Sequence, residues 1–382
     1  MPNIKLGIDC IDEYDHIFQG KKVGLVTNPT GVDSGLVSTI DILFEKTNLT
    51  ALYSPEHGVR GDIQAGEKVE DYIDESTGIK VFTLYGKNKK PTKEVLNGID
   101  ILVIDIQDVG SRLYTYLYTM AYCMQSAKEY GKKIVVLDRP NPLGGEVVEG
   151  NLVKEGFTSF IGLYPIPYRY GLTIGELANF FNEEYEINCD LTVIPMEGWT
   201  RDMHYEDTGL EWVLPSPNMP TVDTAFAYNA TCIFEGTNIS EGRGTTKPFE
   251  FVGAPWLDAE KLTKTMNSKG LSGVAFRPAY FTPTFSKHRE ELCKGVQLHI
   301  LDRESFNATE TSLHLLSAVK RQNPGKFEYT EPYTESGKHM IDYNTGSDYI
   351  RSNDFKPGET YKQWQEEADI FEKQKQAYHI YK

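Results

Sequence analysis

Short apolar stretches alternate with amphipathic stretches through the first half of the chain, and this alternation restricts the fold more than any other feature. Apolar runs begin near residues 22, 49, 80, 100, 133 and 190. Helical periodicity fills the intervals at 37–46, 91–99, 116–130 and 173–185, and the last of these opens with a capping-box pattern at Thr173 and Glu176. Continuous apolar strands separated by helices predict an α/β fold with a mainly parallel sheet covered on both faces.

The second half of the chain changes character after a Pro-rich, turn-like segment at 212–221. Shorter apolar runs follow at 229–236, 273–283 and 295–301, with helical patterns near 258–268 and 308–322. We therefore expect two domains, one at residues 1–225 that carries the parallel sheet and a smaller α+β domain at 226–382.

The charge balance narrows the classes of partner. The net charge of −16 disfavours binding to phosphate backbones, so we expect no nucleic-acid partner. No apolar run approaches the roughly 18 residues that a membrane-spanning helix needs, so we expect no membrane insertion. The N-terminus has no apolar signal region, which predicts a cytoplasmic protein as the sequence stands, or a secreted one if a signal was removed. The oligomeric state is left open.

Cofactor and metal motifs are missing from the sequence. The five cysteines form no CxxC pair, which favours free buried thiols over a disulfide framework or a zinc site. The first strand lacks the GxGxxG fingerprint of dinucleotide-binding proteins, and neither GxxxxGK[ST] nor HExxH occurs. A GxSxG nucleophile elbow is also absent. We expect no cofactor and no metal.

Polar residues follow the apolar runs at several places, and the ends of parallel strands meet at one edge of a sheet, where ligands bind. In SPEHG, Glu56 and His57 stand on a turn between Pro and Gly. Glu56 could be a general acid or base with a pKa raised by partial burial. The alternative is a polar turn whose glutamate caps a following helix.

The segment DIQDVGSRLYTY carries the next group of polar residues. Asp105 and Gln107 share one face of an extended strand, and Asp108 follows them. These side chains could bind sugar hydroxyls, while Arg112 could bind a carboxylate. The alternative is a buried Asp–Arg pair that ties strand to helix. In LDRPNPLGG, Asp138, Arg139 and Asn141 stand on a rigid loop that could lie against a ligand or simply leave the strand.

The second half contributes one dense polar loop. Residues 234–248 place Glu235, Asn238, Glu241 and Arg243 among several glycines. This loop is either part of a substrate site or a long surface hairpin.

Six motifs in this order resemble the NamZ-type exo-β-N-acetylmuramidases, glycoside hydrolase family 171: GLVTNPTG, SPEHG, DIQDVGSRLYTY, LDRPNPLGG, LPSPNMPT and FEGTNISEGRGT. The resemblance covers nearly the whole chain. It implies a Rossmann-like N-terminal domain, a smaller C-terminal domain and a cleft between them. It also implies release of N-acetylmuramic acid from the non-reducing ends of peptidoglycan fragments.

The resemblance places the family's presumed catalytic glutamate at Glu56, which would protonate the glycosidic oxygen. A second group must stabilise the oxocarbenium-like transition state or activate water, and Asp105, Asp108 and Glu241 are the candidates. His57 is a candidate proton relay or hydroxyl ligand. The 2-acetamido group of the substrate is a further candidate nucleophile.

A cation must bind the lactyl carboxylate of muramic acid, and Arg112, Arg139 and Arg243 are the candidates. The other candidate substrate ligands are Gln107, Tyr114, Tyr116, Asp138, Asn141, Ser216, Asn218, Glu235 and Asn238.

Three alternatives compete with the muramidase function: another carbohydrate-active hydrolase, such as a hexosaminidase or esterase, a non-catalytic muropeptide-binding protein, and a nicotinamide oxidoreductase. The missing elbow and glycine fingerprint count against the esterase and the oxidoreductase.

Overall fold

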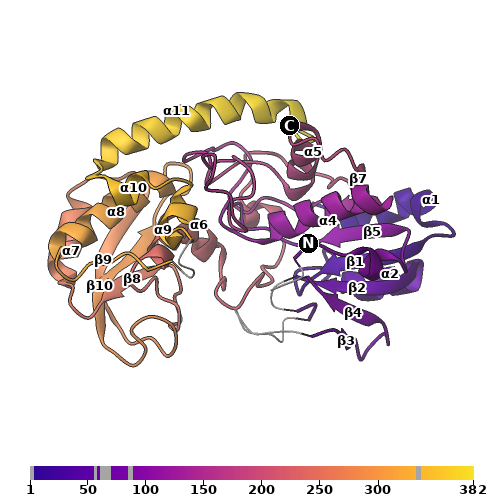
Figure 1. Ribbon diagram of the computed structural model, residues 1–382, viewed down its shortest axis with the longest axis horizontal. Helices are drawn as coiled ribbons and strands as arrows, with labels where there is room; N and C mark the ends of the chain where they lie inside the picture. Colours follow the sequence, from indigo (N-terminus) through magenta and orange to yellow (C-terminus); the bar gives the residue numbers. More distant parts are fainter. Residues whose placement is uncertain (1–3, 56–57, 61–69, 85–88, 333–336) are drawn as a thin grey trace.

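The N-terminal lobe is built on a mainly parallel sheet (Figure 1). The computed structural model describes residues 4–55, 58–60, 70–84, 89–332 and 337–382. Within these ranges the sheet has the order β3-β4-β2-β1-β5-β6-β7, and only the short β3 runs antiparallel to its neighbour. Its strands are β1 (Lys22–Thr27), β2 (Asn48–Ser54), β3 (Tyr72–Ile73), β4 (Lys80–Thr83), β5 (Ile101–Asp105), β6 (Lys133–Leu137) and β7 (Asp190–Ile194). The parallel strands follow the Rossmann order, with a topological switch point between β1 and β5.

Helices cover both faces of this sheet, as the continuous apolar strands predict. One face packs against α3 (Lys93–Leu96), α4 (Tyr116–Tyr130) and α5 (Ile174–Glu184). The other face packs against the 3₁₀ helix η1 (Gly7–Tyr14), α1 (Asp15–Phe18) and α2 (Thr39–Lys46). Alternate residues of one strand serve the two faces: Leu102 and Ile104 belong to the first core, and Val103 to the second.

The C-terminal lobe holds a small antiparallel sheet in the order β8-β10-β9. The strands are β8 (Phe251–Ala254), β9 (Val274–Phe281) and β10 (Cys293–Ile300). Its helices are α6 (Val222–Thr231), α7 (Ala259–Asn267), α8 (Ala308–Gln322), α9 (Met340–Thr345) and α10 (Tyr349–Ser352). The predicted two-domain α/β fold is therefore confirmed, whereas the predicted domain boundary at 225/226 falls inside α6 and stays a prediction.

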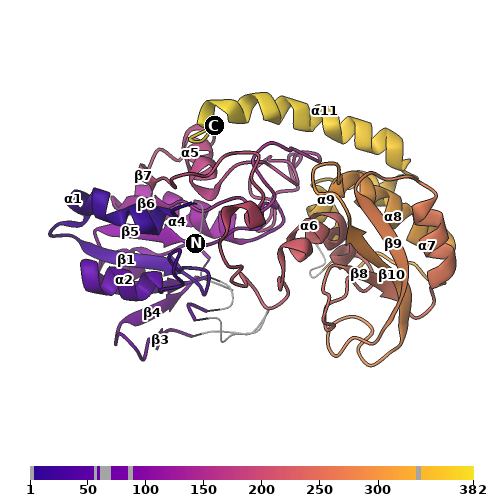
Figure 2. The ribbon, with the colours of Figure 1, turned by 180° about the vertical axis from the view of Figure 1, so that it is seen from behind.

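The long helix α11 (Pro357–Lys375) connects the two lobes along one side of the molecule (Figures 1 and 2). Trp364 near its middle stacks on Tyr168, with ring centroids 5.6 Å apart. Near its end, Phe371 meets Phe180 of α5 edge to face at 5.2 Å. One hydrophobic cluster runs through both lobes without interruption, so the lobes share part of their core.

The strand predicted at 229–236 is wrong. This stretch forms the last residues of α6 and the 3₁₀ helix η3 (Cys232–Gly236). The side chain of Thr221 caps α6 by accepting a hydrogen bond from the Thr224 N–H at 3.2 Å. All but one residue of α6 are buried, so its sequence lacks the polar face that would mark a helix, and its apolar residues resemble a strand.

Candidate functional site

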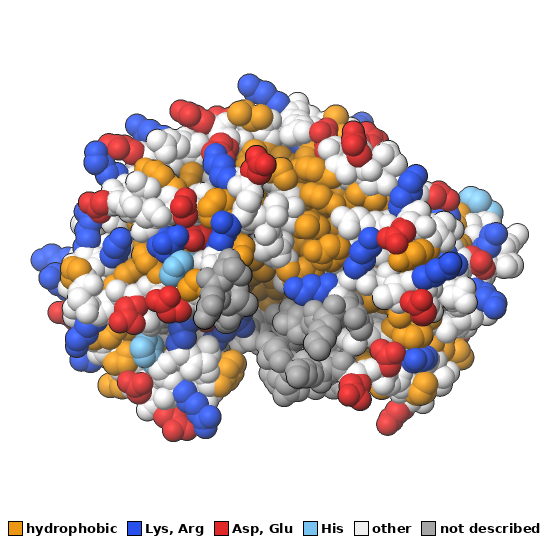
Figure 3. All heavy atoms as spheres, in the orientation of Figure 1, with side chains coloured by type: hydrophobic (Ala, Val, Ile, Leu, Met, Phe, Trp, Pro, Cys, Tyr) orange, Lys and Arg blue, Asp and Glu red, His pale blue; other side chains and the backbone are white. Residues whose placement is uncertain are grey.

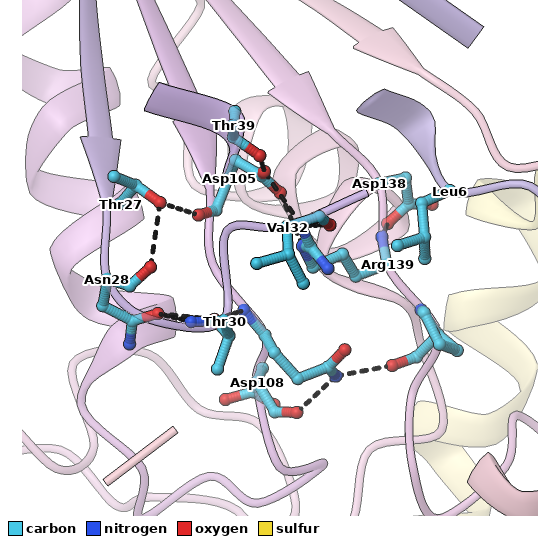
Figure 4. A network of polar contacts seen from close by, with 12 residues as sticks. Leu6, Thr27, Asn28, Thr30, Val32, Thr39, Asp105, Asp108, Asp138 and Arg139 are labelled. Atoms are coloured by element: carbon cyan, nitrogen blue, oxygen red, sulfur yellow. Dashed lines mark hydrogen bonds and ion pairs between the residues drawn. The ribbon is translucent and has the colours of Figure 1, made fainter. Parts of the chain in front are cut away.

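Polar side chains gather at the carboxyl edge of the parallel sheet, around the switch point between β1 and β5 (Figure 4). After β1 the chain turns at Asn28, whose side-chain oxygen accepts hydrogen bonds from both the N–H (3.0 Å) and the hydroxyl of Thr30. The Thr30 hydroxyl oxygen in turn accepts from the Gln107 N–H at 2.9 Å. These contacts hold the loops after β1 and β5 together, where a Rossmann-like fold binds its ligand.

Asp105 at the end of β5 forms a buried ion pair with Arg139, which follows β6. Arg139 donates from Nε to Oδ1 at 2.5 Å and from Nη2 to Oδ2 at 2.9 Å. The hydroxyl of Thr39 also donates to Oδ2. Burial alone would lower the pKa of Arg139, but Asp105 outweighs it and raises the pKa. The buried Asp–Arg pair that the sequence left open therefore exists, with Arg139 rather than Arg112 as the partner of Asp105.

Gln107 and Asn141 use their side-chain amides to shape the loops of this edge. Gln107 donates from Nε2 to the carbonyls of Asp108 (2.7 Å) and Pro140 (2.8 Å), which joins the loops after β5 and β6. Asn141 donates to the Leu172 carbonyl at 2.9 Å. Gln107 and Arg139 also line a small hollow at this edge.

Asp108, which follows β5 at this edge, is held by hydrogen bonds and forms no ion pair with any described cation. Its Oδ2 accepts hydrogen bonds from the Gly110 N–H at 2.7 Å and from the Tyr170 hydroxyl. Its Oδ1 is buried and has no hydrogen-bond partner among the described residues. Burial raises the pKa of Asp108 to about 6, against the opposing effect of those two hydrogen bonds. A carboxyl group with such a pKa can exchange a proton near neutral pH.

Asp138, at the end of β6, is fully saturated by hydrogen bonds. Its Oδ1 accepts from the N–H groups of Arg139 (2.9 Å) and Gly175 (2.7 Å). Its Oδ2 accepts from the hydroxyls of Thr173 (2.7 Å) and Tyr381 (2.6 Å). Burial raises its pKa to about 6. These contacts tie β6 to the start of α5 and to the residue next to the end of the sequence, so the geometry gives Asp138 a structural role.

Arg112 lies at the junction of the lobes. Its side chain is fully buried, and its guanidinium donates to the backbone carbonyls of Asn151, Ile166 (3.0 Å) and Asn344 (3.1 Å). The guanidinium also lies 4.3 Å from the ring centre of Tyr168. These contacts bind the segment before α4 to the long segment between β6 and α5 and to the end of α9, so the structure does not bring Arg112 to the carboxyl edge of the sheet.

Aromatic rings connect the sheet edge to the C-terminal lobe. Tyr114 meets Tyr116 at 4.8 Å and Tyr228 of α6 at 5.9 Å, both edge to face. Tyr228 in turn meets Phe249 at 4.7 Å. Tyr116 donates from its hydroxyl to the carbonyl of Pro215 at 2.5 Å, which holds the 212–221 segment against this edge.

Ser216 and Asn218 stand in that segment. Each retains 8 % of its surface exposed. The loop after β1 reaches the same segment, because Asn28 donates from Nδ2 to the Pro215 carbonyl at 3.4 Å. The segment that carries both residues therefore contacts the loop after β1.

The polar loop of the C-terminal lobe is organised around Arg243. This residue pairs with Glu235 at 2.6 Å and more loosely with Glu241 at 3.4 Å, and its guanidinium lies 4.9 Å from the ring centre of Phe249. A quarter of its side chain remains exposed. Asn238 is used differently, because its amide donates to the Lys326 carbonyl at 2.7 Å and accepts from the Glu328 N–H at 3.1 Å.

Sequence reasoning missed Lys287, which lies between β9 and β10. Its ammonium group donates to the carboxylate of Glu241 (2.8 Å) and to the carbonyls of Phe234 (2.6 Å) and Ile239 (2.9 Å). The flanking Ser286 and His288 have φ values of 68° and 55°, which non-glycine residues seldom adopt. No motif marks such a lysine, because its partners are mostly backbone carbonyls distant in sequence.

The predicted acid, Glu56, and its neighbour His57 lie outside the described residues. β2, which pairs with β1 in the sheet, ends at Ser54, two positions before Glu56 in the sequence. Hydrophobic side chains gather in the hollow between the two lobes (Figure 3).

Within the described ranges, no three His, Cys, Asp or Glu side chains are arranged to hold a metal ion. None of the described helices has the length and apolar character to cross a bilayer.

Comparison with known proteins decides the family. A model of the N-terminal part of the exo-β-N-acetylmuramidase NamZ matches residues 23–223, and a model of its C-terminal part matches residues 226–381. The chain belongs to the NamZ family. Membership makes it a glycosidase of the exo-β-N-acetylmuramidase class, and the family predicted from the six motifs is confirmed.

Individual relatives are similar to this chain in sequence and in structure. The peptidoglycan β-N-acetylmuramidase NamZ of Bacillus subtilis (strain 168) is 55 % identical over 331 residues, covering 86 % of this chain and 80 % of the relative. Two crystal structures of DUF1343 family proteins from Bacteroides fragilis NCTC 9343 are also similar. The first is 42 % identical with a TM-score of 0.91 and covers 100 % of both chains. The second is 31 % identical with a TM-score of 0.79 and covers 99 % of both.

Proposed function

We propose that this chain removes N-acetylmuramic acid from the non-reducing ends of peptidoglycan fragments, with Glu56 as the general acid. The observation that carries this proposal is the 55 % identity to the Bacillus subtilis enzyme, which is named for that substrate. At that level of identity over most of both chains, the same substrate class is the simplest expectation.

The position of Glu56 in the sequence supports its role. It stands two residues after the end of β2, and the carboxyl ends of parallel strands are where Rossmann-like folds bind ligands. A sugar alkoxide is a poor leaving group, so a carboxyl group that holds its proton near neutral pH must lie against the glycosidic oxygen and protonate it as the bond breaks.

Asp108 is our candidate for the second carboxyl group. Of the three candidates, Asp105 is compensated by Arg139 and Glu241 by Lys287. Asp108 has no cationic partner among the described residues and keeps one oxygen without a hydrogen bond. Its charge is therefore free to stabilise a cationic transition state or the group that attacks it.

Arg243 is our candidate for the lactyl carboxylate. Arg112 is fully buried and its guanidinium donates to backbone carbonyls. Arg139 is also buried, and its Nε and Nη2 both donate to Asp105, so neither arginine is placed to bind a substrate carboxylate. Arg243 also donates from Nε and Nη2 to a carboxylate, that of Glu235, but a quarter of its side chain stays exposed on the polar loop. A planar guanidinium can bind a carboxylate through two hydrogen bonds, which would distinguish muramic acid from N-acetylglucosamine.

The test is hydrolysis of a β-N-acetylmuramide whose leaving group is a sugar, beside the corresponding N-acetylglucosaminide. We expect the wild type to cleave only the muramide and Glu56→Gln to lose activity by about three orders of magnitude or more. Glu45→Gln, an exposed carboxyl-to-amide change on α2, is the matched control and should keep full activity.

Three other outcomes would contradict parts of the proposal. If Glu56→Gln keeps most of its activity, another residue is the acid. If the wild type cleaves the glucosaminide equally well, the enzyme is a hexosaminidase of different specificity. If it cleaves neither compound nor isolated peptidoglycan fragments, the chain binds muropeptides without hydrolysing them.

A further inference from the structure

A groove of about 200 Å³ lies between α7 and α8 in the C-terminal lobe, next to the start of α11. Leu262, Ala318 and Pro357 supply apolar surface, and Thr265 and Ser317 add hydroxyl groups. In both views of the ribbon α7 lies on the outer side of this lobe, turned away from the N-terminal lobe (Figures 1 and 2). The groove is therefore separate from the carboxyl edge of the parallel sheet.

The charged residues that line this groove are all cationic. Lys261 and Lys269 come from α7 and the turn after it, and Arg321 comes from the last turn of α8. None of these three side chains forms an ion pair with a carboxylate in the described part of the chain, and no carboxylate lines the groove. The neighbouring Asp258 uses its Oδ1 to cap α7, where it accepts a hydrogen bond from the Lys261 N–H at 3.0 Å.

The pKa of His314 is affected by the same positive charge. It lines the groove from α8, and burial together with the charge of Lys269 lowers its pKa. A carboxylate close to this imidazole would act in the opposite direction. Near neutral pH the charge of the groove therefore comes from two lysines and one arginine.

The positive charge of the groove contrasts with the acidity of the whole chain. The chain carries a net charge of −16. A larger depression of about 720 Å³ at the amino ends of the parallel strands also contains lysines, but it includes Asp100 and Asp190, and Lys133 pairs with Asp190 at 2.8 Å. A cluster of unpaired cations in an acidic protein produces a local positive potential that attracts anionic polymers.

We propose that the α7–α8 groove binds the carboxylate-bearing peptidoglycan polymer at a distance from the catalytic cleft. The proposal rests on the function proposed above for the choice of polymer. Carboxylates of the polymer would meet Lys261, Lys269 and Arg321, and hydroxyl and apolar groups of the sugars would meet Thr265, Ser317 and Ala318. Binding of the polymer at the groove would raise the effective concentration of its chain ends at the active site of an exo-acting enzyme.

The test is co-sedimentation with insoluble peptidoglycan stripped of phosphate-bearing polymers. The triple variant Lys261→Gln, Lys269→Gln and Arg321→Gln removes the groove charges. The control triple variant Lys264→Gln, Lys294→Gln and Lys362→Gln removes three charges from exposed positions of the same lobe and of α11. Both sets are measured in the Glu56→Gln background, so that hydrolysis does not release the protein.

We expect the groove variant to bind at least about tenfold more weakly at low salt than the control variant, and the difference to shrink at high salt. With Glu56 intact, kcat/KM on the soluble muramide should stay within about twofold of wild type, while the rate on insoluble peptidoglycan should fall several-fold. If the muramide is not cleaved but the groove variant still loses binding, the proposed function fails and the groove proposal stands.

Equal losses in both triple variants would overturn the proposal, because net charge alone would then explain the binding. Unchanged binding by the groove variant would also overturn it. A third contrary result is binding to phosphate-bearing wall polymer but not to stripped peptidoglycan, which would mean that the groove recognises phosphate.

Discussion

Arg139 donates two hydrogen bonds to the carboxylate of Asp105, one from Nε at 2.5 Å and one from Nη2 at 2.9 Å, and so joins the ends of β5 and β6. Both side chains are almost completely buried, at 4 % and 0 % exposure. A third hydrogen bond from Arg139 reaches the Val32 carbonyl at 2.7 Å and fixes the loop after β1. The pair thus organises three strand ends around the switch point, and breaking it would leave one buried charge without a partner.

Asp105→Asn should lower the free energy of unfolding by about 3–5 kcal/mol, the usual cost of removing one member of a buried ion pair. Urea denaturation at pH 7 measures this change. Adding Arg139→Met should restore part of the loss, because the unpaired cation is then also removed. Lys5→Gln breaks the exposed pair with Glu197 and should leave the urea midpoint nearly unchanged. A loss at Asp105 as small as that at Lys5 would show that the buried pair contributes little.

Tyr381→Phe should destabilise the N-terminal lobe. The Tyr381 hydroxyl donates to Asp138 at 2.6 Å and accepts from the Met196 N–H at 2.8 Å, so its loss leaves two buried polar groups short of a partner. We expect the free energy of unfolding to fall by about 1–3 kcal/mol. Tyr378→Phe is the matched control, because the Tyr378 hydroxyl donates to an exposed carboxylate, that of Glu184. Equal effects of the two changes would contradict the prediction.

The parallel sheet was predictable from the sequence because each of its longer strands carries a nearly continuous apolar run. The helix over 116–130 matches α4 residue for residue, and the capping box at Thr173 is present, with the Glu176 carboxylate accepting from the Thr173 N–H at 3.0 Å. Local patterns of this kind do not depend on distant contacts. The position of α11, by contrast, depends on tertiary contacts such as that between Lys375 and the Gly145 carbonyl, which no local pattern contains.

The candidate site was predictable in part for the same reason. The polar strand ends after β5 and β6 do meet, because parallel strands end at one edge. The sequence did not predict which carboxylates are paired with cations, because the partners are far apart in the chain. Arg139 pairs with Asp105 from 34 positions away, and Lys287 pairs with Glu241 from 46 positions away. Arg112 is the clearest example of this limit. It stands in the same sequence motif as Asp105, but it binds backbone carbonyls of both lobes.

Lys287→Met should loosen the loop between β9 and β10. The change removes donors to Glu241 and to the carbonyls of Phe234 and Ile239, contacts that hold a loop with several left-handed residues. We expect cleavage after the exposed Glu290 by a glutamate-specific protease to become about tenfold faster. Lys294→Met, an exposed change on β10, should cleave at the wild-type rate. If the two variants are cleaved equally fast, Lys287 does not restrain the loop.

Asp108→Asn should change how stability depends on pH. Burial raises the folded-state pKa of Asp108 from 3.8 to about 6, so the folded protein favours the protonated form. This group therefore stabilises the fold fully below about pH 4, and its contribution is lost as pH rises through about 6. At about 1.4 kcal/mol for each pKa unit, the loss amounts to about 3 kcal/mol. Asparagine does not titrate, so the variant should lack this decrease.

The measurement is urea denaturation of wild type and Asp108→Asn at several pH values between 4 and 7. Asp138, whose pKa is also raised to about 6, titrates in the same window but is present in both proteins, so its effect cancels in the difference. The difference in unfolding free energy between the two proteins should shift in favour of the variant as pH rises. Parallel curves across the window would mean that Asp108 titrates normally, and its candidacy as the second carboxyl group of the site would lose its electrostatic support.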